Sequence, residues 1–281
     1  MADIREVLDN FGDMPILPDV VAKLTQLIAS PRTTASDINE ILSRDPSLTA
    51  RILRLVNSSY YGFSRRITTI TNAVVILGFN QVRNLALSAF IMDNFSVSKA
   101  SGFDMKAFWR HSIGTALVAG HIAKGLRVKL EEDAFVCALL HDLGKSVMAM
   151  KAPEDMRAVL AVVEAERIVF HEAEKKTLDY DHATIGAALM ERWNLPELMV
   201  EVARCHHDPE SASEETRPLA SVVNFADIIA RSTLMGSAGD PFIPRLSPEV
   251  FERTGLNWPG VEAIMRRSAL EYRESDLFFA T

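Results

Sequence analysis

The feature of this sequence with the clearest chemical potential is the adjacent imidazole and carboxylate of His141 and Asp142. The pair follows the apolar run 134–140 and is followed at once by Leu143-Gly144-Lys145. A carboxylate beside such a run is costly to bury unless it is paired, hydrogen-bonded or bound to a metal. Because glycine is common just past a helix C-terminus, we expect both side chains on the last turn of a buried helix, where two neighbouring donors can reach one cation.

Further donors of the same types lie in or beside segments with helical periodicity. Five of the seven histidines are placed in this way, and Asp227 follows the apolar stretch 219–226. Neutral imidazoles and carboxylates suit Fe, Mn, Zn or Ni, and this many donors are enough for two ions. If two ions bind, Asp142 is the best candidate to bridge them, because a carboxylate has two oxygens to share. The candidate metal ligands are His111, His141, Asp142, His182, His206, His207 and Asp227.

Four other residues near the candidate ligands in the sequence give weaker indications of a role. We interpret His121 and His171 as structural histidines. Cys205 precedes His206 and either touches a metal or, as we favour, packs as a small buried hydrophobe. Lys145 has two interpretations: a point charge that binds a phosphate, or a solvated cation favoured by a helix end. The candidate catalytic residues are accordingly Asp142 and Lys145.

The segments that position these donors are predicted to be helices. We expect His111 and His182 to open helices, and His206-His207 to end the helix 197–205. Nearer the N-terminus, apolar residues recur every three or four positions over 17–29. Three start and stop signals accompany that pattern: a capping box at Thr34 and Asp37, a helix start at Asp45-Pro46 and a stop at Gly78. No alternating run is long enough to support a sheet, so the sequence predicts an all-α bundle.

Composition and charge narrow the class of protein. The chain has 281 residues, 48% of them hydrophobic, and a formal net charge of −7. No apolar run could span a membrane, and the N-terminus lacks the order of a secretory signal, so we expect no membrane partner. Only Cys137 and Cys205 are present, which is typical of a reduced cytoplasmic protein. The negative charge argues against nucleic acid as a partner.

Three regions can be distinguished along the chain. Residues 1–95 form an N-terminal helical lobe without histidine, and residues 96–235 carry every histidine. The stretch 96–102 resembles a connector between these two lobes. Residues 236–281 contain a loop and a final amphipathic helix that we expect to pack on the same unit through Val261, Ile264, Met265 and Leu270.

The order of the candidate ligands resembles the metal-ligand series of the HD superfamily of phosphohydrolases, and most closely the two-metal layout of its HD-GYP branch. The N-terminal third is similar to the HDOD domain, a bacterial signalling relative of those enzymes. Together the two resemblances cover roughly residues 10 to 235. The blocks that carry the second one are Leu17-Pro18-Asp19-Val20-Val21, Asp45-Pro46-Ser47-Leu48-Thr49-Ala50-Arg51-Ile52-Leu53, Val56-Asn57-Ser58-Ser59-Tyr60-Tyr61-Gly62 and Ala73-Val74-Val75-Ile76-Leu77-Gly78.

The resemblance implies a multi-helix HD-type bundle with an additional N-terminal helical lobe. It also implies a division of the ligands around the shared Asp142. Two ions about 3.5–4 Å apart can generate a hydroxide and clamp a phosphate oxygen during in-line attack. One ion would be held by His111, His141 and Asp227, and the other by His182, His206 and His207.

Two departures from the HD-GYP pattern argue against cyclic di-GMP hydrolysis and against a third metal. Those phosphodiesterases carry a Gly-Tyr-Pro-containing segment where this chain has Asp208-Pro209-Glu210-Ser211. Some also place a Glu one helical turn before the first histidine, where this chain has Ala107. HDOD relatives have commonly lost ligands and act as non-catalytic signalling modules, whereas the ligand set of this chain is complete.

Two functions therefore remain open. The first, which we favour, is a bacterial signal-transduction module of the HDOD type that retains a metal-loaded HD site. It would act by binding a signalling protein partner or a phosphate-containing small molecule, with the N-terminal lobe as the interaction surface. The second is an active metal-dependent phosphohydrolase or phosphodiesterase on a nucleotide or other phosphoester.

Overall fold

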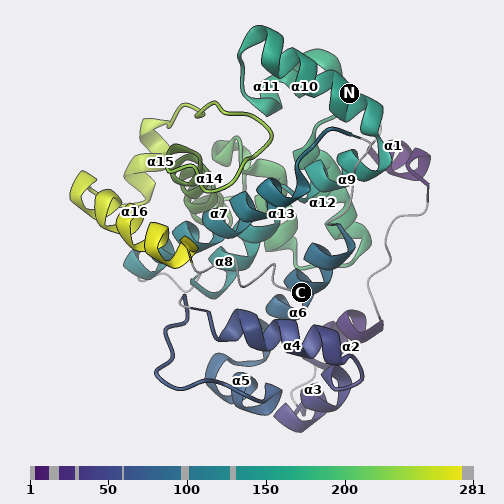
Figure 1. Cartoon of the computed structure of the whole chain (residues 1–281), viewed down its shortest axis with the longest axis vertical. Helices are drawn as coiled ribbons and strands as arrows, with labels where there is room; N and C mark the ends of the chain where they lie inside the picture. Colours follow the sequence, from purple (N-terminus) through teal and green to yellow (C-terminus); the bar gives the residue numbers. More distant parts are fainter. Residues whose placement is uncertain are drawn as a thin grey trace. The chain divides into compact units, whose positions relative to one another are not determined.

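The computed structural model describes residues 4–12, 19–28, 32–58, 60–95, 101–126 and 131–273. In that part of the chain all regular structure is helical, with sixteen α-helices and one short 3-10 helix (Figure 1). The predicted all-α fold is confirmed. Among the described helices, none combines the length and the apolar character that crossing a membrane requires.

The chain divides into two compact units. The small unit is Pro15–Asn94 with Arg273–Thr281, and the large unit is Met1–Met14 with Phe95–Tyr272. The described helices of the small unit are α2 (Asp19–Ile28), α3 (Ala35–Leu42), α4 (Pro46–Val56), α5 (Ile70–Leu77) and α6 (Phe79–Asn94).

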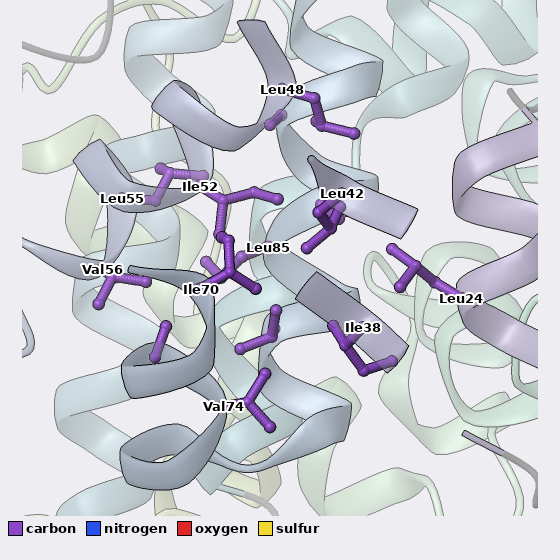
Figure 2. Close-up of a cluster of buried hydrophobic side chains, with 14 of the residues drawn as sticks. Leu24, Ile38, Leu42, Leu48, Ile52, Leu55, Val56, Ile70, Val74 and Leu85 are labelled. Atoms are coloured by element: carbon purple, nitrogen blue, oxygen red, sulfur yellow. The ribbon is translucent and has the colours of Figure 1, made fainter. Parts of the chain in front are cut away.

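The small unit is held together by a core of aliphatic side chains. Figure 2 shows side chains from all five helices pointing toward one another. Each contributes about 1.5–3 kcal/mol relative to its exposed state. The labelled members of this core are Leu24, Ile38, Leu42, Leu48, Ile52, Leu55, Val56, Ile70, Val74 and Leu85.

The helix ends of the small unit follow the start and stop signals of the sequence. Thr34 and Asp37 form the predicted capping box at the start of α3. Asp45 caps α4 by accepting from the backbone N–H of Leu48, with Pro46 at the first helical position. Gly78 ends α5 with φ of 84°, a left-handed value that favours glycine.

The third HDOD block, residues 56–62, has a structural role at Asn57 and Tyr61. The side chain of Asn57 donates to the carbonyls of Leu53 and Ile67, at 2.6 and 2.7 Å, and accepts from the N–H of Ile67 at 2.7 Å. It therefore fixes the loop that follows α4. The hydroxyl of Tyr61 accepts from the side chain of Gln81 at 2.7 Å, so this tyrosine is used for packing and hydrogen bonding.

The large unit contains the remaining helices. Its long helix α7 packs along α8 and α14, while α12 packs on α9 and α13. Their bounds are α1 (Ile4–Asn10), α7 (Met105–Leu126), α8 (Glu131–Leu140), α9 (Leu143–Lys151), α10 (Pro153–Glu166), α11 (Phe170–Thr177), α12 (His182–Arg192), α13 (Glu197–Cys205), the 3-10 helix η1 (Pro209–Ser211), α14 (Arg217–Ser232), α15 (Pro248–Arg253) and α16 (Trp258–Arg273).

The His141-Asp142 pair lies in a turn rather than on the last turn of a helix, so this part of the sequence prediction is wrong. Helix α8 ends at Leu140, the two residues make the turn, and α9 begins at Leu143. The predicted helix stop, Gly144, is instead the second residue of α9. The turn directs the imidazole and the carboxylate into the space between helices.

Gly144 is required by a close contact between two helices. A Cβ at this position would lie 1.9 Å from the carbonyl oxygen of His182 and 2.9 Å from the backbone nitrogen of Gly186. Both atoms belong to the backbone of α12, so neither can rotate away. The absent side chain thus lets the turn of Asp142 approach the helix that carries His182.

Two other placements differ from the sequence predictions. His111 lies inside α7, which begins at Met105, rather than opening that helix. In α16, Val261 is buried as expected, but Leu270 is 65% exposed. The apolar face of this helix is therefore narrower than the sequence pattern indicated.

Some sequence features fall outside the described residues. These are the Leu17-Pro18 part of the first HDOD block, Ser59 of the third block, and residues 96–100 of the predicted connector.

Replacing Gly144 with alanine is expected to destabilise the large unit. The added methyl group meets backbone atoms, so the free energy of unfolding should fall by at least about 1–3 kcal/mol, as for other overpacked sites. Gly125→Ala is the matched control, because a Cβ on that helical glycine would meet nothing within 4 Å and alanine is the better helix former. Urea unfolding measures both; equal stability of the two variants would contradict the close contact.

Candidate metal centre

Five separate segments of the large unit supply the predicted donors. His111 comes from α7, the His141-Asp142 pair from the turn before α9, and His182 from the start of α12. The His206-His207 pair directly follows α13, as predicted, and Asp227 lies within α14. Asp181 caps α12 with a capping box and so fixes the position of His182 at its first turn.

Potential ligand atoms of these residues gather in two groups, in each of which they lie within 4.8 Å of one another. We call Asp142, His182, His206 and His207 the His182 group. We call His111, His141 and Asp142 the His111 group. Asp142 belongs to both.

Asp142 presents a different oxygen to each group. Its Oδ1 lies 3.0 Å from Nε2 of His182 and 3.4 Å from Nε2 of His206. Its Oδ2 lies 3.3 Å from Nε2 of His141. The carboxylate therefore has the placement that a bridge between two ions requires, which the sequence could propose only from the chemistry of the residue.

Hydrogen bonds at Nδ1, the ring nitrogen that does not face Asp142, orient three of the imidazoles. Nδ1 of His141 lies 2.6 Å from the carbonyl of Ala138, and Nδ1 of His206 lies 2.7 Å from the carbonyl of Ala203. Nδ1 of His182 lies 2.6 Å from the carboxylate of Glu174. Because carbonyl and carboxylate oxygens only accept, each Nδ1 carries a hydrogen, and Nε2 is the atom that can bind an ion when the imidazole is neutral.

Two buried polar atoms at the centre of the cluster lack a hydrogen-bond partner. They are Nε2 of His141 and Oδ1 of Asp142. Leaving such atoms unsatisfied costs about 1–3 kcal/mol each, and more for a charged group. A cation between these donors would satisfy both, so the donor set fits a divalent metal.

The charge states of the His182 group differ from one imidazole to the next. Burial lowers the pKa of His206 to about 4, helped by the neighbouring imidazoles, and holds the pKa of His207 well below its usual value. Burial also opposes charge on His182, but the carboxylates of Glu174 and Asp142 raise its pKa to about 9. His206 and His207 are thus neutral near pH 7, as an imidazole must be to bind a metal.

Lys145 is buried and paired. Its side chain is fully buried, its Nζ donates to Oδ2 of Asp142 at 2.7 Å, and the ammonium lies 5.0 Å from the centre of the Phe170 ring. The interpretation as a solvated cation at a helix end is wrong, since Lys145 lies in the first turn of α9. Burial would raise the pKa of Asp142, but His141 and Lys145 hold it well below the usual value.

Asp227 is held by a cation of the protein as well as by an imidazole. Its Oδ1 lies 2.8 Å from Nε2 of His111, and both its oxygens accept from Nε of Arg231 at 2.9 and 3.0 Å. A carboxylate buried after the apolar stretch 219–226 would be hard to explain if it were unpaired. Arg231 supplies the partner, and Asp227 is absent from both groups of converging ligand atoms.

Sequence reasoning misses several residues around the cluster. Glu174 lies in a polar stretch of the sequence, although Phe170, Ala173 and Glu174 share one helical face, a spacing that could have indicated its burial. His171, interpreted as structural, stacks its ring on His207 at 4.2 Å between centroids. Arg231 lies four residues after Asp227, a spacing that indicates an ion pair along a helix. Asp240 gives no local signal for its contact with Phe170, which lies 70 residues away in the sequence.

The structure also shows the surroundings of His121 and Cys205. His121 is buried away from the cluster, with its Nε2 2.7 Å from Glu271. Cys205 packs with Ala212 and Ala220, as a small hydrophobe would.

A cleft reaches the edge of the His111 group. It has a volume of about 290 Å³ and is lined by His111, Arg231, Asp240 and the loop 234–241. In the His182 group, His207 is only partly buried. Small molecules therefore have two directions from which to approach the cluster.

A family model of the HDOD domain matches residues 14–209, so the chain belongs to the HDOD domain family. It is 35% identical over 227 residues, 80% of its length, to an uncharacterized protein of Treponema pallidum (strain Nichols). The chain spans 44% of that protein's length, and less than half the length of the other curated relatives it matches.

Solved structures share the fold over almost the whole chain. An HDOD domain protein of unknown function from Geobacter sulfurreducens has a TM-score of 0.82 and 27% identity, covering 99% of this chain and 97% of that one. A candidate phosphohydrolase from Shewanella amazonensis SB2B has a TM-score of 0.74 and 27% identity, covering 98% of each chain.

Replacing Lys145 with methionine is expected to destabilise the metal-free protein more than the metal-loaded one. Without the ammonium the buried Asp142 loses a counter-charge, and breaking such a pair costs about 3–5 kcal/mol. Bound ions would supply the missing positive charge. Unfolding in urea with EDTA, and then with saturating Mn or Zn, measures the difference, and exposed Lys106→Met is the control. An equal loss under both conditions would show that Lys145 acts through packing alone.

Proposed function

We propose that this HDOD protein is a bacterial signal-transduction module with a retained, two-metal HD-type centre. It acts by binding a signalling protein partner or a phosphate-containing small molecule. The observation that carries the proposal is the pair of unsatisfied buried atoms, Nε2 of His141 and Oδ1 of Asp142, at the point where the two donor groups meet. An ion of Fe, Mn, Zn or Ni would satisfy them.

The residues that would hold the ions follow from the two donor groups. One ion would be held by His182, His206 and His207, and the other by His111 and His141, with Asp142 shared. Asp227 would join the second ion by replacing its contact to His111. Such ions supply Lewis-acid attraction for a phosphate oxygen.

Burial of the donors favours binding over turnover. Closed metal sites are typical of structural roles, whereas catalytic sites keep a ligand position open. Here His111, His141, Asp142 and His182 are each at most 1% exposed. Oδ2 of Asp142 also accepts from Lys145, and Oδ1 is crowded by the imidazoles of His182 and His206, which leaves little room for an attacking water.

A small-molecule ligand would enter by the cleft at His111 or by the partly exposed edge at His207. A protein partner would use the small unit, which carries none of the donors. Its helix α5 exposes Val75 and Ile76, at 74% and 50%, and exposed aliphatic side chains are common at interaction sites. Cys137 and Cys205 are both free and buried, which accords with the reducing cytoplasm.

An active metal-dependent phosphohydrolase on a nucleotide or other phosphoester is the alternative. It is supported by the likeness to the candidate phosphohydrolase from Shewanella amazonensis SB2B and by the cleft at His111. In this case Lys145 would exchange its contact with Asp142 for one with a phosphate. Against it, the segment after His207 is the short helix η1, which brings neither a glycine nor a tyrosine to the site.

Metal analysis followed by a hydrolysis assay separates the two functions. We expect purified protein to retain close to two ions per chain and to show no turnover of chromogenic phosphodiesters or phosphomonoesters with Mn, Fe or Zn. Asp142→Ala should lose ions from both groups, because it removes the shared ligand. His121→Gln is the control, since His121 lies outside the cluster, and should keep them.

Two results would contradict this proposal. Turnover that disappears in Asp142→Ala would establish the hydrolase instead. A wild-type protein that takes up no divalent ion, even after incubation with excess Mn, Fe or Zn, would remove the basis for both functions.

A further inference from the structure

Asp240 is a buried carboxylate of the large unit that touches none of the candidate ligands. Its side chain is fully buried, in the loop 234–241 after α14. Oδ2 accepts from Nη1 of Arg231 and from the backbone N–H of Phe170, each at 2.9 Å, and Oδ1 accepts from the N–H of Phe242 at 2.9 Å. One carboxylate thus joins two elements, α14 and the start of α11.

The first connection leads to the His111 group. Arg231 donates with its Nε to both oxygens of Asp227, and Asp227 lies 2.8 Å from Nε2 of His111. Burial would lower the pKa of Arg231, but Asp227 and Asp240 together raise it above its ordinary value. The guanidinium is therefore held between two carboxylates, one beside His111 and one in the loop.

The second connection leads to the His182 group. Phe170 is the first residue of α11, and one turn later the same helix carries Glu174, which is completely buried. Glu174 accepts from Nδ1 of His182 at 2.6 Å and from its backbone N–H at 2.9 Å. The position of α11 therefore decides where the His182 ring points.

The loop is held in place by close packing and by a backbone hydrogen bond to α7, in which the N–H of Ser237 donates to the carbonyl of Ala107 at 2.9 Å. Gly236 has φ of 75°, and a Cβ there would lie 2.3 Å from the carbonyl oxygen of Ala107. Gly239 has φ of 102° and lies against the rings of Phe103 and Phe170. The backbone before Asp240 therefore packs closely against α7 and α11, and this packing fixes the position of the carboxylate.

We propose that Asp240 is a positioning residue that sets the metal affinity of both donor groups at once. It acts through Arg231 and Asp227 on the His111 group, and through α11 and Glu174 on the His182 group. The inference rests on the proposed function, because it requires that both groups bind ions. Residues that orient metal ligands without touching the ion typically change affinity by about 10–100-fold when altered.

The test is a titration of metal-free protein with Mn, read as two stepwise dissociation constants by calorimetry and as ions per chain after equilibrium dialysis. Asp240→Asn keeps the shape but removes the charge, and it should raise both constants by about 10–100-fold. Glu174→Gln should raise only the dissociation constant of the His182 group. Arg231→Lys should raise only that of the His111 group. Ser232→Ala, at an exposed position of α14 that is on neither connection, should change neither constant.

A second variant and a spectrum keep the test decisive. Asp240→Glu retains the charge at a longer reach and should also weaken both sites, which covers the case in which Asp240→Asn fails to fold. Visible absorption of the Co-loaded protein reports ligand geometry, which a general loss of stability would not alter.

The outcomes separate this inference from the proposed function. Wild-type protein that binds two ions, with Asp240→Asn unchanged or altered in one constant only, overturns the role of Asp240 and leaves the metal centre standing. Wild-type protein that binds no ion overturns both. Two weakened constants in Asp240→Asn, with one each in Glu174→Gln and Arg231→Lys, support the inference.

Discussion

The burial of one carboxylate, Asp142, is the constraint on which the rest of this structure depends. The side chain is 1% exposed and lies among imidazoles, where an unpaired charge would be very costly. Lys145 offsets part of that cost at Oδ2, while Oδ1 remains without a hydrogen-bond partner. Gly144 makes the placement possible, because it lets the turn lie against the backbone of α12. The charge, its partner and the close helix contact occupy four consecutive residues.

The metal centre is also a product of the helices around it. Its donors come from five segments, so each donor is placed by the packing of a helix rather than by a local loop. Nδ1 of each of three histidines is occupied by an oxygen of the protein, which turns the Nε2 atoms inward. Behind them, three further charges are buried and paired: Glu174 contacts His182, and Arg231 joins Asp227 to Asp240. Such a set of charges is favourable only when every member is satisfied.

The sequence predicted what depends on local chemistry. The helix starts at Thr34, Asp45 and His182 and the stop at Gly78 could be predicted because helix-capping signals are short-range. The donor residues could be named from their types and order. The turn at His141 could not be predicted. Glycine is common at helix ends, whereas Gly144 lies inside α9 and is required by the close contact with α12. Lys145 and Arg231 pair with carboxylates three and four residues away, but the contacts of Lys145 and Asp240 with Phe170 join segments far apart in the sequence, which periodicity does not reveal. Glu174 lies between these cases, because its helical face was visible but its partner was not.

Metal binding by the two donor groups around Asp142 can be tested by anomalous diffraction. Crystals of the chain would be grown with Mn or Zn, and data collected at the absorption edge of the metal. We expect two peaks, one enclosed by His182, His206 and His207 and one beside His111 and His141, with Asp142 between them. Peaks confined to surface carboxylates, with the imidazoles unliganded at saturating metal, would contradict it.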